Sequence, residues 1–160
     1  MDIYTGLGYD IHKLVRNRKF ILGNIEIPYS KGFLAHSDGD VLIHALIDAL
    51  LGAGGFGDIG SYFPDNDPAY KGIDSSLLLQ KTMTMLTNEK YQLINIDATI
   101  ICQKPKIGTY KDIIKEKLSQ LTGLPKERIS IKGKTKECMD SAGKGKAVEV
   151  FCAVLIKRGE

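Results

Sequence analysis

The sequence predicts a single α+β domain in which helices pack on one face of a mixed sheet of roughly four strands. Segments with the β-branched, alternating pattern of strands occupy 3–12, 93–101 and 147–156. A helical pattern and a further short strand at 129–131 follow the middle segment, which indicates a sandwich containing a β-α-β unit. The chain has 160 residues without a linker or repeat, so we expect residues 1–160 to form one domain.

The elements follow from local signals. The first strand ends with Asp10-Ile11-His12, and apolar residues on both sides of Gly23-Asn24 predict a β-hairpin with its turn at that dipeptide. Asp38 is expected to cap the next helix, which has Asp40 in its first turn and runs to about Leu51. The later elements are a loop over 55–72, a helix over 75–90 capped by Asp74, and a helix over 110–122 ended by Gly123 and Pro125.

Composition excludes several classes of protein. Apolar residues make up 43% of the chain and charged residues 26%, with a net charge of +3, so neither a nucleic-acid-binding nor a disordered protein is indicated. No apolar segment is long enough to span a membrane, and no secretory signal is visible. Cys102, Cys138 and Cys152 form no C-x-x-C pair and are expected to be reduced. We therefore expect a cytoplasmic protein, or a plastid-type organelle protein if a transit peptide has been removed.

One apolar helix carries a single polar row. Asp40, His44 and Asp48 recur every four residues, which places them on one side of the helix. A narrow solvent-facing stripe explains this row as well as a binding site does. Asp10 and His12, two residues apart in a strand, point to the same face, although D-x-H alone is a common chance pattern.

Together these fragments can form a metal site. Asp10, His12 and His44 would offer one oxygen and two nitrogens and leave one tetrahedral position open, as in catalytic zinc sites. The chain has three histidines, and spacing does not decide whether His36 or His44 is the third ligand. We favour His44, because a buried helix would hold it rigidly.

Three further regions can hold parts of a phosphorylated ligand. The loop from Gly57 to Pro68 contains three carboxylates, which suit hydroxyl groups or a hard cation, but Asp, Asn and Pro are also ordinary turn formers. Lys104-Pro105-Lys106 and the Lys- and Gly-rich segment 132–146 offer amides and ammonium groups for phosphates. A solvated strand end explains the first segment equally well. An exposed hairpin tip is the commonest explanation of the second, and no P-loop pattern is present.

Longer motifs carry a resemblance to one family. Asp10-Ile11-His12, Ala35 to Ala53, Gly57 to Gly72 and Thr99 to Lys106 are similar in order and spacing to motifs of the cyclodiphosphate synthases of the non-mevalonate isoprenoid pathway. The two central blocks are too long to match by chance. The similarity covers nearly the whole chain.

The resemblance implies a homotrimer, with sheets around a central threefold axis and active sites between subunits. It implies a lyase whose substrate, 4-diphosphocytidyl-2-C-methyl-D-erythritol 2-phosphate, is attacked at its β-phosphorus by its own 2-phosphate to give the cyclic 2,4-diphosphate and CMP. One zinc ion per subunit would be held by Asp10, His12 and His44, and a second divalent cation, magnesium or manganese, by Glu137. Asp48 is expected to lie just outside the zinc ligands.

The resemblance also assigns substrate contacts. His36 and Thr135 would steady the phosphates during the reaction. The erythritol part would contact Ser37, Asp58, Ile59, Gly60, Phe63, Pro64, Asp65, Asn66 and Asp67. The neighbouring subunit would surround cytidine and its phosphates with Cys102, Gln103, Lys104, Pro105, Lys106, Ile107, Gly108, Lys134 and Lys136.

The last block departs from the family pattern. Ser141 stands where the family usually has an aromatic residue, Lys144 where it has arginine, and Lys146 where glutamate is common. In the family these positions touch substrate or line a cavity on the threefold axis that takes an isoprenoid diphosphate. Ser141 and Lys144 are therefore kept as substrate-binding candidates, whereas the effector cavity is left unassigned. Lysine keeps the charge of arginine but loses its bidentate geometry.

Two other functions are open on the residues alone. A zinc phosphohydrolase would use a bound water with Asp58 or Asp65 as base and would release free phosphate. A nucleotide- or RNA-binding module would use the lysines of 132–146, but the neighbouring strands offer only Phe151 for base stacking.

Overall fold

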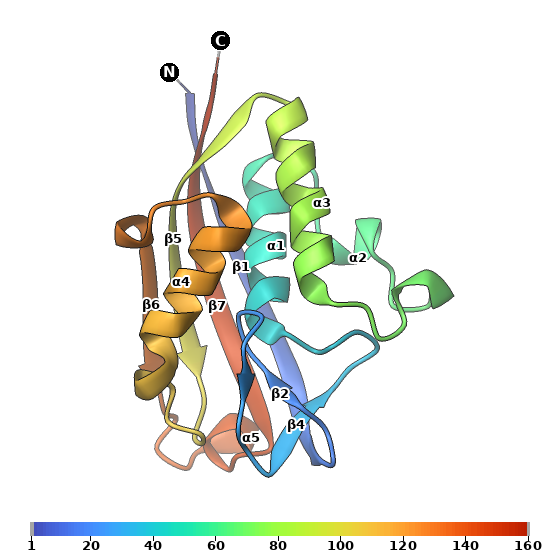
Figure 1. Ribbon diagram of the computed structural model, residues 1–160, viewed down its shortest axis with the longest axis vertical. Coiled ribbons are helices and arrows are strands. Elements are labelled where there is room, and N and C mark those ends of the chain that lie inside the picture. Colours follow the sequence, from blue (N-terminus) through green and yellow to red (C-terminus); the bar gives the residue numbers. More distant parts are fainter. Residues whose placement is uncertain (1, 160) are drawn as a thin grey trace.

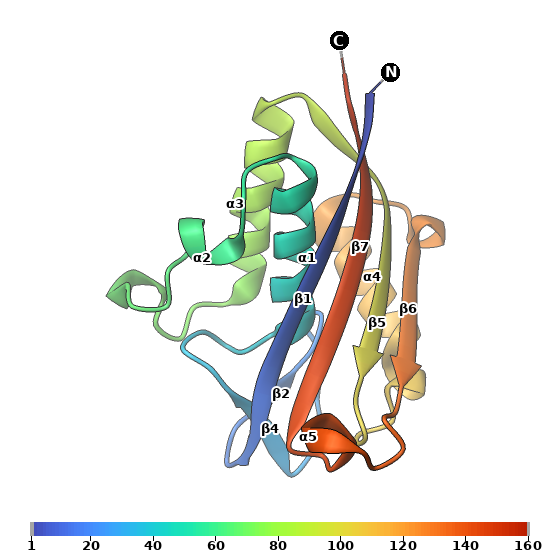
Figure 2. The same ribbon diagram turned by 180° about the vertical axis from the view of Figure 1, so that it is seen from behind.

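The computed structural model describes residues 2–159 and has two layers, a sheet and a group of helices that covers one of its faces (Figures 1 and 2). The strands are β1 (Asp2–Arg16), β2 (Phe20–Ile21), β3 (Glu26–Ile27), β4 (Lys31–Leu34), β5 (Tyr91–Ile101), β6 (Ile129–Lys134) and β7 (Ala147–Arg158). The helices are α1 (Val41–Ala53), α2 (Ile59–Tyr62), α3 (Ser75–Asn88), α4 (Lys111–Thr122) and α5 (Asp140–Gly143), with 3-10 turns at Pro68–Tyr70, Ile107–Tyr110 and Lys126–Arg128. The α+β class predicted from the sequence is confirmed.

The main sheet has the strand order β4-β1-β7-β5-β6, and β2 and β3 form a separate hairpin. β5 and β6 are parallel and are connected through α4, so the predicted β-α-β unit is present. β1 pairs antiparallel with β7 from Asp2↔Arg158 to Lys13↔Ala147, which brings the two ends of the chain side by side (Figure 2). The sheet is mixed, as predicted, but it has five strands instead of four.

Two predictions about strands were wrong. The edge strand β4 was not expected, because its four residues include a glycine and lack an alternating pattern. β1 does not end at His12 but continues to Arg16, where its last residues pair with β4. Asp10 and His12 therefore lie inside a long strand instead of at its end.

The start of α1 also differs from the prediction. Asp40, not Asp38, caps the helix, because its side chain accepts a hydrogen bond from the Ile43 amide. The same buried carboxylate accepts hydrogen bonds from the amides of Gly23 and Asn24 at 2.9 and 2.6 Å. Burial raises the pKa of Asp40 to about 6, against the lowering effect of these amides. The predicted hairpin is confirmed, and Asp40 ties its turn to the helix.

The segment 55–72, predicted to be a loop, contains two short turns of helix. Asp58 caps α2, and Asp67 caps the 3-10 turn that follows. The helix predicted after Asp74 is confirmed as α3. The helix predicted over 110–122 is confirmed as α4, which ends at Gly123 in the left-handed conformation.

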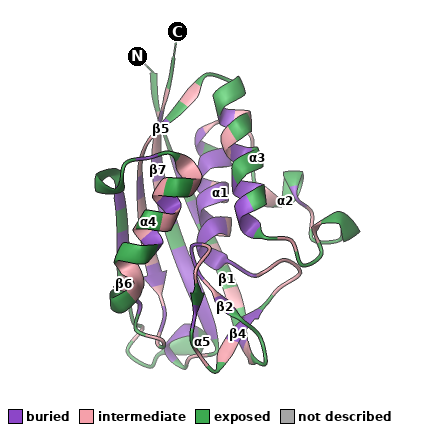
Figure 3. Cartoon of the chain, in the orientation of Figure 1, coloured by how far each residue is buried: buried purple, intermediate pink, exposed green. Residues whose placement is uncertain are grey.

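The two faces of the sheet differ in what covers them. The helical side holds the core, which includes every apolar side chain of α1 (Figure 3). The opposite face carries the exposed side chains of Ile3, Leu7, Tyr9, Ile11 and Phe151. An apolar patch of this kind is typical of a surface that packs against another protein. Within residues 2–159, no helix has both the length and the apolar character needed to cross a bilayer.

α1 lies directly on β1 because two residues of that strand have no side chain. A Cβ atom at Gly6 would lie 1.9 Å from the Ala49 carbonyl oxygen, and one at Gly8 would lie 1.9 Å from the Ala45 carbonyl oxygen. Not even a methyl group fits between the two backbones there. These contacts fix the helix against the strand at two points about one helical turn apart.

We predict that Gly8→Ala destabilises the fold by at least about 3 kcal/mol, because the added methyl group forces α1 away from β1. Gly52→Ala is the matched control, since it lies in α1 with open space around the Cβ position. We expect this control to gain up to about 1 kcal/mol. Urea denaturation followed by circular dichroism measures both changes, and native stability of Gly8→Ala would contradict the close approach.

Candidate metal centre

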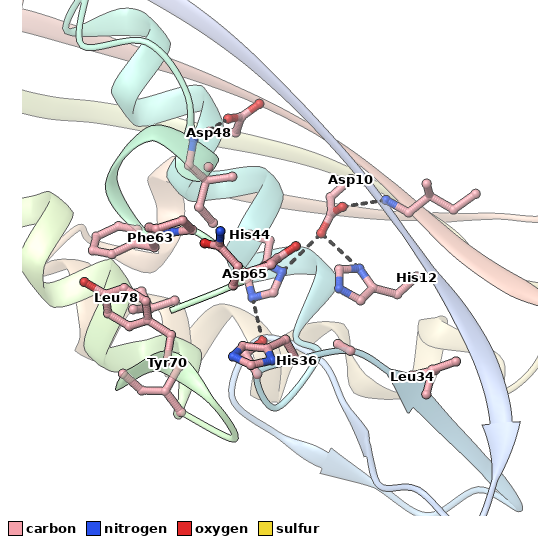
Figure 4. A pocket seen from close by; sticks show the side chains of 18 of the residues that line it. Asp10, His12, Leu34, His36, His44, Asp48, Phe63, Asp65, Tyr70 and Leu78 are labelled. Atoms are coloured by element: carbon pink, nitrogen blue, oxygen red, sulfur yellow. Dashed lines mark hydrogen bonds and ion pairs between the residues drawn. The ribbon is translucent and has the colours of Figure 1, made fainter. Parts of the chain in front are cut away.

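β1 and α1 contribute the side chains of one cluster. Successive residues of a strand face opposite sides, so Asp10 and His12 share the face that α1 covers. His44 lies on α1, and its ring points toward Asp10 (Figure 4). The structure therefore brings the three predicted zinc ligands together.

The three side chains meet at one carboxylate oxygen. Asp10 Oδ2 lies 3.0 Å from His12 Nδ1 and 3.2 Å from His44 Nδ1. One potential ligand atom from each residue lies within 4.8 Å of the other two. In the part of the chain that the structure describes, this is the only group of three such side chains placed closely enough to share an ion.

The cluster changes the proton affinities of its members. Burial would raise the pKa of Asp10, but interactions with His12 and His44 outweigh it and lower the pKa to about 2. Burial would lower the pKa of His44, but the hydrogen bond and the charge of Asp10 outweigh it and raise that pKa. Asp10 is therefore an ionised ligand at neutral pH, while protons compete with a metal ion for His44.

The donor atoms fit a bound cation. His12 Nδ1 is buried and, among residues 2–159, has no hydrogen-bond partner with suitable geometry, although Asp10 lies 3.0 Å away. A buried polar atom without a partner is rare in native proteins unless an ion or water satisfies it. Two imidazole nitrogens and one carboxylate oxygen, with a fourth position open, are the usual donors of a catalytic zinc site.

Hydrogen bonds on the far side of the His44 ring fix the position of its proton. His44 Nε2 lies 2.9 Å from Ser75 Oγ and 3.2 Å from Ser37 Oγ. Ser75 Oγ donates to Asp38 Oδ1. Because the Ser75 hydroxyl gives its proton to Asp38, its oxygen is left to accept from His44 Nε2–H. His44 Nδ1 then carries the lone pair that faces Asp10, as a metal ligand requires.

The cluster opens into a cleft of about 610 Å³. Of the residues predicted for substrate contact or metal support, those lining this cleft are His36, Ser37, Asp48, Ile59, Gly60, Phe63, Pro64, Asp65 and Asn66. Asp48 accepts a hydrogen bond from the Ile59 amide at 3.0 Å, which holds α2 beside α1. Asp58 and Asp67 do not line the cleft, because their carboxylates cap short helices. The carbonyl oxygen of Asp67 lies 3.3 Å from His36 Nε2.

A second cleft, of about 520 Å³, lies where β5 and β6 end. The predicted cytidine- and phosphate-binding residues that line it are Cys102, Gln103, Lys104, Lys106, Ile107, Gly108, Lys134, Thr135 and Glu137. Thr135 Oγ1 donates to Glu137 Oε1 at 2.6 Å. Pro105, Lys136, Ser141 and Lys144 are not among its lining residues, and Lys144 lines a separate shallow depression.

The two clefts share no lining residue within one chain. The cluster of Asp10, His12 and His44 therefore lies with His36, Ser37 and Asp48, whereas Thr135 and Glu137 belong to the other cleft. Sequence reasoning missed Ser75 as a partner of His44 and assigned Asp38 a different role. Both residues stand at helix starts, where capping alone accounts for Ser and Asp.

Comparison with known proteins identifies a family. The model of the YgbB family matches residues 3–157. A protein of Brachyspira hyodysenteriae named 2-C-methyl-D-erythritol 2,4-cyclodiphosphate synthase is 51% identical over 153 residues, which are 96% of this chain and 97% of that protein. The solved bifunctional IspDF of Campylobacter jejuni has a TM-score of 0.95 at 36% identity, over 99% of this chain and 43% of its own. A solved 2C-methyl-D-erythritol-2,4-cyclodiphosphate synthase with bound CDP has a TM-score of 0.88 at 37% identity, over 96% of this chain and 99% of its own.

We predict that the protein binds zinc through this cluster and that His44→Ala abolishes the binding. Ser75→Ala should weaken zinc binding by about 10- to 100-fold, because the ligand ring loses the acceptor that orients it. Competition with a chelator of known affinity, followed by metal analysis, measures this change. Ser76→Ala is the matched control, since Ser76 is also buried in the first turn of α3. Native zinc affinity in Ser75→Ala would overturn the assigned tautomer.

Proposed function

The chain belongs to the YgbB family, and from this membership and the site geometry we propose that it closes a cyclic diphosphate in non-mevalonate isoprenoid biosynthesis. The proposed substrate is 4-diphosphocytidyl-2-C-methyl-D-erythritol 2-phosphate. An oxygen of its 2-phosphate bonds to the β-phosphorus, while the bond from that phosphorus to the bridging oxygen breaks. CMP leaves with the electron pair of the broken bond, and 2-C-methyl-D-erythritol 2,4-cyclodiphosphate remains. No protein nucleophile is required.

The observation that carries this proposal is the cluster of Asp10, His12 and His44, with an open position, at the base of a polar cleft. Two phosphates repel each other as they approach, so the site must supply positive charge. A zinc ion held by the cluster would act as a Lewis acid toward a phosphoryl oxygen. The chain itself would orient the flexible polyol for ring closure, a contribution of about 7–11 kcal/mol in well-aligned intramolecular reactions.

His36 is proposed to hold a phosphate in the same cleft. Its Nε2 lies 3.3 Å from the Asp67 carbonyl oxygen, which can only accept, so Nε2 is the donor in that contact. Nδ1 is then the ring atom left for the substrate, and it donates to a phosphate oxygen when the ring is protonated. The Asp67 contact also keeps the ring beside the segment proposed to bind the erythritol part.

The complete active site is proposed to form between subunits of a homotrimer. One subunit would supply the zinc cleft, and its neighbour would supply the cleft of Thr135 and Glu137 for cytidine, its phosphates and a magnesium or manganese ion. The absence of shared lining residues supports this division. The exposed apolar sheet face supports association around a threefold axis. The CDP bound to a similar solved enzyme supports a cytidine diphosphate ligand.

The two rival functions have weaker support. Of the bases considered for a phosphohydrolase, Asp65 lines the zinc cleft but Asp58 does not. In the lysine-rich segment proposed for RNA, Lys132 and Lys136 form ion pairs of 2.7 and 2.6 Å with carboxylates. These pairs neutralise part of the positive charge that nucleic-acid binding needs.

Incubation with the substrate, zinc and magnesium tests the proposal directly. We expect CMP and the cyclic diphosphate in equal amounts by phosphorus NMR, whereas free phosphate would identify a hydrolase. His44→Ala should release almost no CMP, because the zinc ligand set is incomplete. A metal-free His44→Ala protein with native turnover would refute the role of the cluster.

We predict that Glu137→Ala folds and assembles normally but loses about 10²- to 10³-fold in turnover, because the divalent cation that would stabilise transition-state charge loses its ligand. Glu116→Ala is the control, because this exposed carboxylate on α4 pairs with Lys126 and lines neither cleft. Light scattering and CMP release measure assembly and activity. If Glu137→Ala failed to assemble, Glu137 would be a structural residue.

A further inference from the structure

Lys136 stands between two residues of the second cleft but points away from them. Thr135 and Glu137 both line that cleft and are joined by a hydrogen bond of 2.6 Å. The ammonium group of Lys136 instead lies 2.6 Å from Glu149 Oε1 and 2.9 Å from Asp140 Oδ2. Hydrogen bonds to charged partners at these distances are of the strong class.

Glu149 is an unusual residue for its position. It lies in β7 opposite Ile11, on the sheet face that carries the exposed apolar side chains, yet it is only 7% exposed. The Tyr9 hydroxyl donates to its second oxygen at 3.4 Å. A carboxylate this buried requires a charged or hydrogen-bonded partner, and Lys136 is the cation that meets it.

The segment that follows Lys136 needs such an anchor. Glu137, Cys138 and Asp140 all adopt positive φ angles, of 48°, 64° and 53°, which are unfavourable for residues with a side chain. Three strained residues within four positions persist only where the surroundings hold them. We call residues 135–143 the strained turn.

The contacts around the strained turn are mostly internal. Asp140 Oδ1 accepts from the Ala142 and Gly143 amides, and the Lys136 carbonyl oxygen accepts from the Met139 amide at 2.8 Å. For the described residues, 2–159, Lys136 to Glu149 is the only ion pair that joins this turn to the sheet. The pair therefore ties Lys136, the residue next to Glu137, to β7.

We propose that Lys136 is a positioning residue: by pairing with Glu149 it fixes the strained turn so that the Glu137 carboxylate stays in the second cleft. The proposal rests on the proposed function, in which Glu137 holds a divalent cation. Lys136 acts through Glu137 and touches neither the substrate nor the cation. A direct phosphate contact by Lys136, as the family resemblance implies, is the competing role.

Manganese affinity separates these two roles. We expect Lys136→Met to weaken Mn²⁺ binding by about 10-fold or more, the usual effect of removing a residue that orients a metal ligand. The readout is free Mn²⁺, measured by electron paramagnetic resonance on the zinc-loaded full chain with CDP. Lys132→Met is the matched control, because Lys132 also forms an ion pair of 2.7 Å with a sheet carboxylate, Asp97, but lies outside the turn.

A second variant guards against misfolding. Lys136→Met alone leaves the buried Glu149 unpaired, so Lys136→Met/Glu149→Gln removes both charges at once. Because the residues act as a pair, the double variant should bind Mn²⁺ no more weakly than Lys136→Met does. Lys136→Arg keeps the charge and should retain Mn²⁺ affinity within about threefold of the native protein. Excess Mn²⁺ should restore kcat in Lys136→Met.

The Mn²⁺ affinities of these variants decide whether Lys136 is a positioning residue. Native Mn²⁺ affinity in both Lys136→Met and the double variant, or a raised substrate KM as the only defect, would overturn the positioning role. If Glu137→Ala leaves Mn²⁺ binding unchanged, the second-cation part of the proposed function fails instead. The hydrogen-exchange rate of the Met139 amide then tests whether the ion pair between Lys136 and Glu149 holds the strained turn. Faster exchange in Lys136→Met supports this role of Lys136, and exchange at the native rate overturns it.

Discussion

The backbone contact between α1 and β1 is the constraint on which the site depends. Gly6 and Gly8 allow the helix to touch the strand, with Ala45 and Ala49 as the facing residues. Small residues on both elements leave no room for adjustment, so the height and rotation of α1 relative to β1 are fixed. His44 is one residue before Ala45, and it therefore reaches the oxygen of Asp10 that His12 also meets. A metal site made from one strand and one helix needs this kind of rigid contact, because a displacement of about 1 Å spoils its geometry.

Two carboxylates before α1 help to hold the metal-site elements in place. Asp40 caps the helix and holds the hairpin turn, so its burial is compensated by three amide donors. Asp38, which is free of the cap, instead accepts from Ser75 and so connects α3 to the ligand ring of His44. Two neighbouring carboxylates thus have separate tasks, one for the fold and one for the imidazole. Asp40 has the capping role because its carboxylate is the one that reaches the free amides of the first turn of the helix.

Sequence patterns that repeat locally predicted much of this protein. Features that depend on contacts between distant segments could not be predicted from the sequence. The shared face of Asp10 and His12 followed from a period of two residues, and the polar row that contains His44 followed from a period of four. The choice of His44 over His36 rested instead on the rigidity expected of a buried helix. β4 could not be predicted, because a four-residue edge strand is defined by its pairing with β1 and not by its own composition. Lys136 could not be placed either, since its direction is set by Glu149, thirteen residues later on another strand. Capping by Asp40 instead of Asp38 is a shift of two residues, within the usual error at helix ends.

The departures of this chain from its family pattern lie where they leave the metal centre untouched. Ser141, Lys144 and Lys146 line neither of the two clefts. Ser141 lies in the strained turn, and Lys144 and Lys146 follow it, just before the start of β7. Glu149 and Lys136 form an ion pair at the edge of the same region, on the apolar face that is proposed to meet other subunits. Only the Glu149 side of this pair is buried. Such a pair adds little stability, because desolvation of the carboxylate offsets the attraction between the charges, but it restricts how the surrounding backbone can pack. Variation in this region can therefore change the surface proposed to meet other subunits, while β1 and α1, which carry the three candidate metal ligands, stay in place.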